Sequence, residues 1–99
     1  MRRAARQDAN HADVVGALRA IGCSVLDLSR HGNGCPDILV YVPKLHAYVL
    51  VEIKDGSKPP SKRKLTPDQE KFHREWRGPV VVVESVDEAL RLFGAVRAA

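Results

Sequence analysis

Two short aliphatic runs, each bounded by charged residues, most constrain how this chain can fold. Ile38–Val42 and residues 48–51 are rich in β-branched and aliphatic side chains, which are typical of strands. The connection over residues 43–46 is short and begins with a proline. We therefore predict a hairpin-like turn that joins two antiparallel neighbouring strands.

Charged side chains lie at the ends of these two predicted strands. Asp37 begins the first strand, and Glu52 and Lys54 end the second. Because strand side chains alternate between faces, Glu52 and Lys54 point to one side and Ile53 to the other. Each charge alone is explained by a turn or a solvated strand end. Together, two converging carboxylates beside an ammonium group predict a Mg²⁺ site for phosphodiester hydrolysis, which Mn²⁺ can also occupy.

The remaining periodic segments predict an α/β domain. We expect, in chain order, a helix over 8–21, a strand over 23–28, the two central strands, a helix from Thr66 to about Trp76, a strand over Val80–Val83 and a closing helix over 87–96. This order favours a mixed sheet covered on both faces. At 99 residues, the chain (1–99) is expected to form a single domain, with 1–7 as a flexible basic N-terminus.

The second predicted helix has a well-formed start. Thr66 is expected to be its N-cap residue, and Gln69 can complete a capping box or face the charged strand ends. Phe72 and Trp76 lie four residues apart and so share one face of this helix. Core packing is the expected role of this pair, with base stacking or a dimer contact as the alternatives.

The charge of the chain favours a polyanionic partner. Sixteen Lys and Arg residues against 12 Asp and Glu residues give a formal net charge of +4. Four of these cations lie in a basic segment, residues 55–64, which follows the second central strand. Glycine and two prolines exclude regular structure there. The cations expected to contact DNA phosphates, with salt-sensitive affinity, are Lys58, Lys62, Arg63 and Lys64. A solvated charge run is the alternative.

Cysteine content and hydropathy indicate a cytoplasmic protein. Cys23 and Cys35 are too few for a disulfide scaffold and are expected to be free thiols. No apolar stretch approaches membrane-spanning length, and the basic N-terminus is not followed by an apolar signal core. We therefore expect no membrane association.

The motif Gly34-Cys35-Pro36-Asp37 followed by Glu52-Ile53-Lys54 resembles the PD-(D/E)XK signature of restriction-endonuclease-like nucleases. The wider pattern, which includes residues 8–10 and 65–69, resembles the small phage-type branch related to VRR-NUC and Holliday-junction-resolvase-like enzymes. The similarity runs from about residue 8 to residue 90. It implies an αβββαβ core, in which helices flank a mixed central sheet, and a phage or prophage origin within a bacterial host.

The resemblance also implies roles for individual residues. Asp37, Glu52 and the backbone carbonyl of Ile53 would bind the metal, Lys54 would be the catalytic lysine, and Gln69 would face the site. Many relatives carry a further Glu ligand on the first helix, where this chain offers His11 or Asp8 instead. The implied function is a metal-dependent DNA endonuclease, acting on branched or junction DNA as a homodimer.

Two other functions are compatible with the same sequence. A catalytically inactive relative could keep the fold and the basic segment and still bind nucleic acid, since no first-helix Glu is evident. A structural or interaction protein could instead use the charged strand ends in ion pairs. DNA cleavage, DNA binding without cleavage, and the absence of both would separate the three functions.

Overall fold

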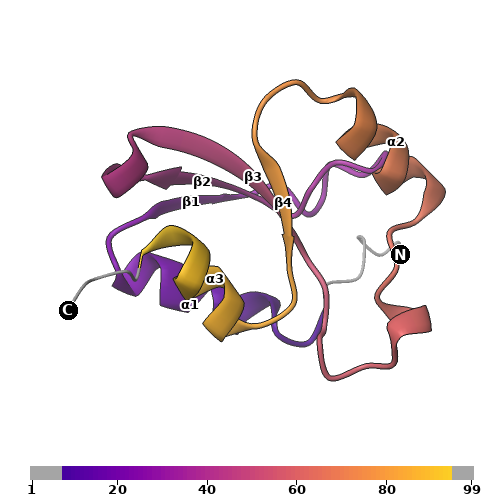
Figure 1. Ribbon diagram of the computed structural model, residues 1–99, viewed down its shortest axis with the longest axis horizontal. Coiled ribbons are helices and arrows are strands. Elements are labelled where there is room, and N and C mark those ends of the chain that lie inside the picture. The colour runs from indigo at the N-terminus through magenta and orange to yellow at the C-terminus, as the bar shows by residue number, and fades with distance from the viewer. Residues whose placement is uncertain (1–7, 95–99) are drawn as a thin grey trace.

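The computed structural model describes residues 8–94, and the predicted basic N-terminus (1–7) and Val96 lie outside them. The elements in chain order are α1 (His11–Ala20), β1 (Ser24–Asp27), β2 (Ile38–Val42), the 3₁₀ turn η1 (Pro43–Leu45), β3 (Ala47–Ile53), the 3₁₀ turn η2 (Pro60–Lys62), α2 (Pro67–Glu75), β4 (Val80–Val83) and α3 (Val86–Phe93) (Figure 1). The predicted αβββαβ order with a closing helix is confirmed. η2 corrects the expectation that the basic segment has no regular structure.

The four strands form one mixed sheet in the order β1-β2-β3-β4. β2 is antiparallel to β1 and β3, as predicted for the central pair, whereas β4 is parallel to β3. The register of the central hairpin pairs Ile38 with Val51. Asp37 comes directly before Ile38 and Glu52 directly after Val51, so both carboxylates reach the same end of the hairpin.

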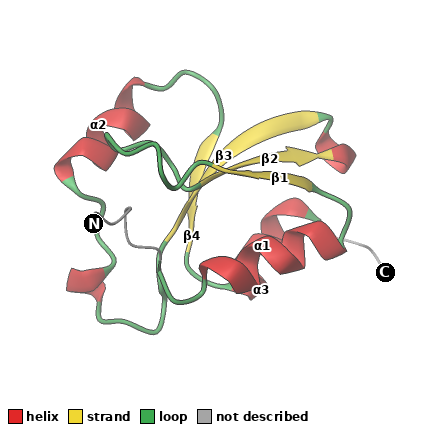
Figure 2. Ribbon diagram, turned by 180° about the vertical axis from the view of Figure 1, so that it is seen from behind, coloured by secondary structure: helices red, strands yellow, loops and turns green. Residues whose placement is uncertain are grey.

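The hydrophobic core lies between one face of the sheet and the helices α1 and α3. Ile38, Val40 and Val42 alternate with less buried neighbours on β2 and pack toward Leu18 of α1 and Phe93 of α3. Figure 2 shows both helices on the same side of the strands. The expected alternation of strand faces therefore directs the apolar residues of β2 into this core.

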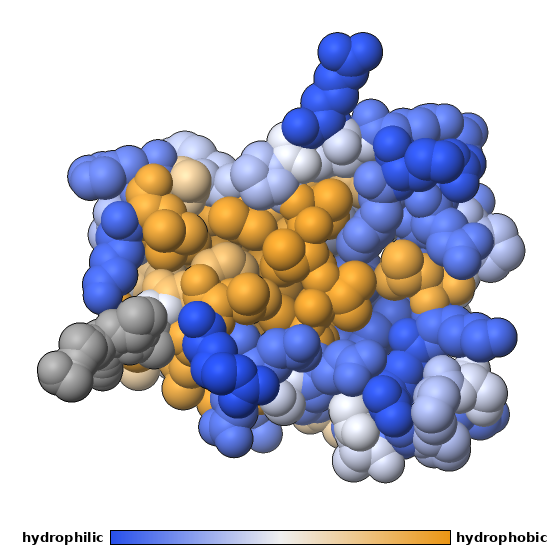
Figure 3. Space-filling view, viewed as in Figure 1, coloured by the Kyte–Doolittle hydropathy of each residue, from blue (hydrophilic) through white to orange (hydrophobic). Residues whose placement is uncertain are grey.

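The opposite face of the sheet is not covered by α1 or α3. Leu26 is 57% exposed and Tyr48 is 62% exposed on this face, and Tyr41 and Tyr48 pair across the strands with their ring centroids 4.9 Å apart. The predicted mixed sheet flanked by helices is confirmed, but the second face is covered only in part, because α2 lies beyond the end of the sheet instead of across it (Figure 1). Figure 3 shows apolar side chains gathered over the strands and α3, with hydrophilic side chains at the end where α2 lies.

The glycine loop before β2 holds the start of α2 in place. Gly34 has a φ of +80°, and a Cβ atom at this position would collide with the backbone carbonyl of Asp68. Loop and helix can approach this closely only because residue 34 has no side chain. The beginning of α2 is therefore fixed against the loop that delivers Asp37.

The aromatic pair on α2 is not part of the core. None of the residues of α2 is buried, and the C-cap residue Trp76 is 47% exposed. Phe72 and Trp76 stack on each other, with ring centroids 5.2 Å apart and an interplanar angle of 16°. The expected core role of this pair is wrong, because the helix does not pack on the sheet. Within the part of the chain that the structure describes, no helix is both long and apolar enough to cross a membrane.

Candidate active site

Asp37 and Glu52 meet at the end of the central hairpin, as their sequence positions predict. The Oδ2 atom of Asp37 accepts a hydrogen bond of 2.7 Å from the backbone N–H of Ile53. This bond orients the Asp37 carboxylate against the end of β3. Glu52, the neighbour of Ile53 on the strand, is only 3% exposed. The two acidic groups are therefore held together by the backbone of one strand.

The close approach of these carboxyl groups changes their acidity. Burial, followed by the negative charge of Asp37, raises the pKa of Glu52 to about 8. Burial also raises the pKa of Asp37, against the opposing effect of its hydrogen bond from Ile53. Two carboxylates held this close together, one buried and one half-buried, repel each other unless a proton or a cation neutralises them. The site therefore favours binding of positive charge.

Lys54 and Gln69 complete a polar network around Glu52. The Nζ atom of Lys54 donates a hydrogen bond of 2.9 Å to the Oε1 atom of Gln69 and lies 3.8 Å from the Oε2 atom of Glu52. The Nε2 atom of Gln69 donates a 3.1 Å hydrogen bond to that same Oε2 atom. Glu52 and Lys54 thus point to one side of the strand end, as predicted, and Gln69 bridges them from α2.

Gln69 also fulfils its expected capping role. Its Oε1 atom accepts a hydrogen bond from the backbone N–H of Thr66, and its own backbone N–H donates to the Thr66 hydroxyl. This reciprocal arrangement is a complete capping box. One side chain therefore starts α2 and contacts the charged network at the same time.

The donor set fits a hard divalent cation. The Oε1 atom of Glu52 is buried and has no hydrogen-bond partner within residues 8–94, which leaves an oxygen free to coordinate a metal ion. No group of three or more His, Cys, Asp and Glu residues suited to a metal is present among the residues described. Two carboxylates and a backbone carbonyl suit Mg²⁺, which usually keeps several water ligands.

The two first-helix candidates, His11 and Asp8, take different positions. His11 is 4% exposed, and its Nε2 atom lies 3.3 Å from the Oδ2 atom of Asp27 on β1. Burial acts to raise the pKa of Asp27. Two hydrogen bonds from Ser29, and then the charge of His11, outweigh burial and lower this pKa below its usual value. Asp8 borders the same recess as the acidic pair and lies 3.6 Å from Lys58. A ligand role for either residue remains a prediction.

These side chains border a polar recess of about 290 Å³. Its walls include Asp8, Cys35, Asp37, Glu52, Lys54 and Gln69. Both cysteines are free thiols, as expected, with Cys23 buried and Cys35 half-buried. Burial, followed by the charges of Glu52 and Asp37, raises the pKa of the Cys35 thiol. Cys35 therefore stays protonated at neutral pH and is not suited to act as a nucleophile.

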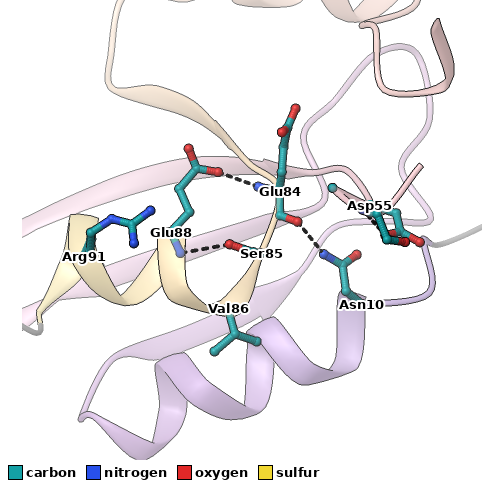
Figure 4. Close-up of a pocket in the computed structure, with 9 residues that line it drawn as sticks. Asn10, Asp55, Glu84, Ser85, Val86, Glu88 and Arg91 are labelled. Carbon is teal, nitrogen blue, oxygen red and sulfur yellow. Dashed lines mark hydrogen bonds between the residues drawn. The ribbon is translucent and has the colours of Figure 1, made fainter. Parts of the chain in front are cut away.

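Asn10 is a positioning residue that the sequence did not reveal. Asn10 occupies the N-cap position of α1, but its side chain makes no cap hydrogen bond. Instead, its Nδ2 atom donates to the backbone carbonyls of Lys54, at 3.0 Å, and Glu84, at 3.2 Å. Figure 4 shows Asn10 reaching Glu84 beside a second recess of about 540 Å³. Asn10 therefore joins α1 to the ends of β3 and β4.

The four predicted phosphate contacts in the basic segment are not equivalent. Lys58 lies 3.6 Å from Asp8, and Arg63 forms a 3.1 Å contact with Glu84 and donates to the carbonyl of Lys58. Lys62 and Lys64 are exposed and form no ion pair with another of the residues described. Lys58 and Arg63 therefore anchor the segment, whereas the other two cations extend into solvent.

Comparison with known proteins gives a family for this chain. No family model matches, and no curated protein matches. A solved structure described as "VRR_NUC domain" matches with a TM-score of 0.59 and 31% sequence identity, over 80% of this chain and 84% of that chain. The chain belongs to the VRR-NUC family. The resemblance read from the sequence is thereby confirmed at the level of this family, as is the restriction-endonuclease-like fold.

VRR-NUC membership agrees with the arrangement of the charged strand ends. The sequence motifs placed Asp37, Glu52, Lys54 and Gln69 in one site, and the structure brings all four to the border of a single recess. Sequence reasoning missed the anchoring role of Asn10 and the pairing of His11 with Asp27. Neither contact has a sequence signal, because each joins residues that lie far apart along the chain.

Proposed function

We propose that this VRR-NUC domain is a metal-dependent DNA endonuclease of the PD-(D/E)XK type. One observation carries the proposal: the buried carboxylate of Glu52 forms a polar network with Lys54 and Gln69, and the half-buried carboxylate of Asp37 borders the same recess. Two carboxylates held close together are costly unless a proton or a cation neutralises them, and such pairs are concentrated at catalytic sites. An acidic pair beside a lysine is suited to hydrolysis of a phosphodiester.

Asp37, Glu52 and the carbonyl of Ile53 would hold Mg²⁺ or Mn²⁺. The bound metal would supply the positive charge that offsets negative charge on the phosphodiester as it reacts. Lys54 is already oriented by Gln69 and Glu52, so its ammonium group can donate to a phosphoryl oxygen or position the attacking water. The hydrogen bond between Ile53 and Asp37 keeps one carboxylate fixed during this step.

The substrate we propose is DNA, with branched or junction DNA preferred. The net charge of +4 and the exposed Lys62 and Lys64 support a polyanionic partner next to the recess.

We also propose a homodimer, which would place two sites on one branched substrate. The uncovered sheet face with exposed Leu26 and Tyr48 supports such a contact. Sedimentation compares the oligomeric state of the wild type with that of Tyr48→Lys, which places a charge on this face. A monomeric wild type would contradict the homodimer.

The decisive test is cleavage of labelled junction, flap, duplex and single-stranded DNAs with Mg²⁺, Mn²⁺ or EDTA. We expect metal-dependent cutting that Lys54→Ala abolishes while the circular dichroism spectrum is unchanged. Lys44→Ala is the matched control, because Lys44 is exposed in the turn at the opposite end of the hairpin. Salt-sensitive binding without cleavage under any metal would identify a non-catalytic relative instead.

We also propose that the chain belongs to the phage-type branch and has a phage origin, which the genomic neighbourhood of its gene would test. Localisation of a tagged protein would test the proposed cytoplasmic location.

A further inference from the structure

A row of aromatic side chains continues from the proposed active site along α2. Gln69, Phe72, His73 and Trp76 are spaced by three or four residues, which places them on one face of the helix. Gln69 contacts Lys54 and Glu52, so this face is turned toward the recess. At 1.5 Å per residue, Trp76 lies about 10 Å further along the helix axis.

The rings in this row are in contact with one another. The Phe72 and Trp76 rings stack, and the ring of His73 meets Phe72 edge-on with a centroid distance of 6.5 Å. Burial, followed by the charge of Lys54, lowers the pKa of His73 below its usual value, so its ring stays uncharged at neutral pH. The Nε2 atom of His73 is buried and has no hydrogen-bond partner within residues 8–94.

The outermost ring is both exposed and held in position. Trp76 is 47% exposed although one face of its indole lies on Phe72. A Cβ atom at Gly78 would come within 2.9 Å of the indole Nε1 atom, so Gly78 leaves room for the ring. A large aromatic ring that is fixed by neighbours but open to solvent is a platform for a flat partner.

The position of this platform favours a nucleic acid over an apolar partner, because its helix face continues from Gln69 and the proposed nuclease site. The exposed Arg77 follows Trp76 directly, whereas Lys71 and Arg74 lie outside this row, as do the exposed carboxylates of Asp68, Glu70 and Glu75. Exposed rings bind single strands because bases stack on them while nearby cations contact the phosphates. A recess of about 320 Å³ beside Phe72, which Asn33, Asp68, Lys71 and Glu75 also line, adds space next to the platform.

We propose that Phe72, His73 and Trp76 form a stacking platform for unpaired bases of the DNA strand that enters the active site. The inference rests on the proposed nuclease function and deepens it by naming the substrate class. Bases within a duplex are stacked on their neighbours, whereas the bases of a flap, a splayed arm or an open junction offer a free face. The domain would therefore prefer DNA with a single-stranded segment within a few nucleotides of the cleaved bond.

The chain offers a direct optical test, because Trp76 is its single tryptophan. The probes are a short single-stranded oligonucleotide, the blunt duplex of the same sequence, and that duplex with a single-stranded flap, all in EDTA. Binding is followed independently by the anisotropy of a dye on the DNA. We expect the single strand and the flap to quench tryptophan emission, and the blunt duplex to leave it nearly unchanged at saturation.

Variants separate aromatic stacking from general binding. Trp76→Leu should weaken binding of the single strand and the flap by about 5- to 150-fold, the range expected for loss of one stacked base. Trp76→Phe should retain most of the affinity. Leu92→Ala is the control, because Leu92 is an apolar residue of α3 with a similar exposure of 46%. It should leave all affinities unchanged.

The outcomes that contradict the platform are distinct from those that contradict the nuclease. Saturating single strand without quenching, or equal affinity of Trp76→Leu and wild type, would overturn the platform while cleavage of duplex DNA still supported the nuclease. Loss of self-association in Trp76→Leu, measured by sedimentation, with unchanged DNA affinity would assign the ring to a second copy of the chain. Absence of binding to every DNA would overturn both proposals.

Discussion

The Nε2 atom of Gln69 donates a 3.1 Å hydrogen bond to the Oε2 atom of Glu52, although the two residues belong to elements that barely pack on each other. Glu52 is a buried residue near the end of β3, whereas Gln69 lies on a helix without buried residues. The polar network of the candidate active site is thus also a main attachment of α2 to the sheet. Under the proposed function, local stability and catalysis would be coupled through this single side chain.

Gln69→Ala should reduce DNA cleavage by about 10- to 100-fold, because it removes a partner that orients two functional groups. It should also destabilise the protein, since the capping box is lost. Thr66→Ala removes the same cap and should cost about 1 kcal/mol without breaking the contacts to Lys54 and Glu52. Urea unfolding and initial cleavage rates of both variants provide the measurement. Equal losses of activity would show that Gln69 acts only as a capping residue.

The metal-free protein should become less stable as pH rises through the range in which Glu52 titrates. The pKa of this carboxyl is about 8 in the folded protein and 4.5 when unperturbed. A raised folded pKa contributes stability that is complete below about pH 4.5 and is lost as pH rises through about 8. The melting temperature in EDTA should therefore fall over this range, and Glu52→Gln should flatten the profile. Glu75→Gln, which changes an exposed carboxyl, should leave the slope of melting temperature against pH unchanged. A steep slope in Glu52→Gln would disprove that titration of Glu52 causes the pH dependence.

Gly34→Ala should destabilise the protein more than Gly32→Ala. Both glycines have a positive φ, +80° and +76°, which costs a residue with a side chain about 1 to 2 kcal/mol. Only at Gly34 would the added Cβ atom also collide with the backbone of Asp68, while nothing lies within 4 Å at Gly32. Chemical denaturation of the two variants measures the difference. Equal free energies of unfolding would mean that the loop and α2 separate easily.

The exposed cations of the basic segment should contribute to DNA binding differently from the anchored ones. Lys62→Ala and Lys64→Ala should each reduce the slope of log affinity against log salt by about 1, with no effect on stability. Arg63→Ala should lower the free energy of unfolding by up to about 1 kcal/mol, because it removes the contact with Glu84. Binding titrations at several salt concentrations and urea unfolding distinguish the two effects. Unchanged salt slopes in both lysine variants would exclude Lys62 and Lys64 from the interface.

Local patterns in the sequence determined the order of elements and the placement of the acidic pair. Aliphatic runs defined β2 and β3, a short turn made them neighbours, and strand alternation placed Glu52 and Lys54 on one side. The Thr66 and Gln69 capping box was equally readable, because its partners lie three residues apart. Such features depend on spacing along the chain, which the sequence contains directly.

Only the tertiary structure decided which faces are covered and which distant residues meet. The periodicity of Phe72 and Trp76 is the same whether a helix packs on a sheet or stands beyond its end, so their exposure could not be predicted. The contacts of Asn10 with Lys54 and Glu84 span 44 and 74 residues of sequence, and no local pattern encodes them. Hydrophobic periodicity determines which side of an element is apolar, whereas the partner of that side is chosen by packing of the whole chain.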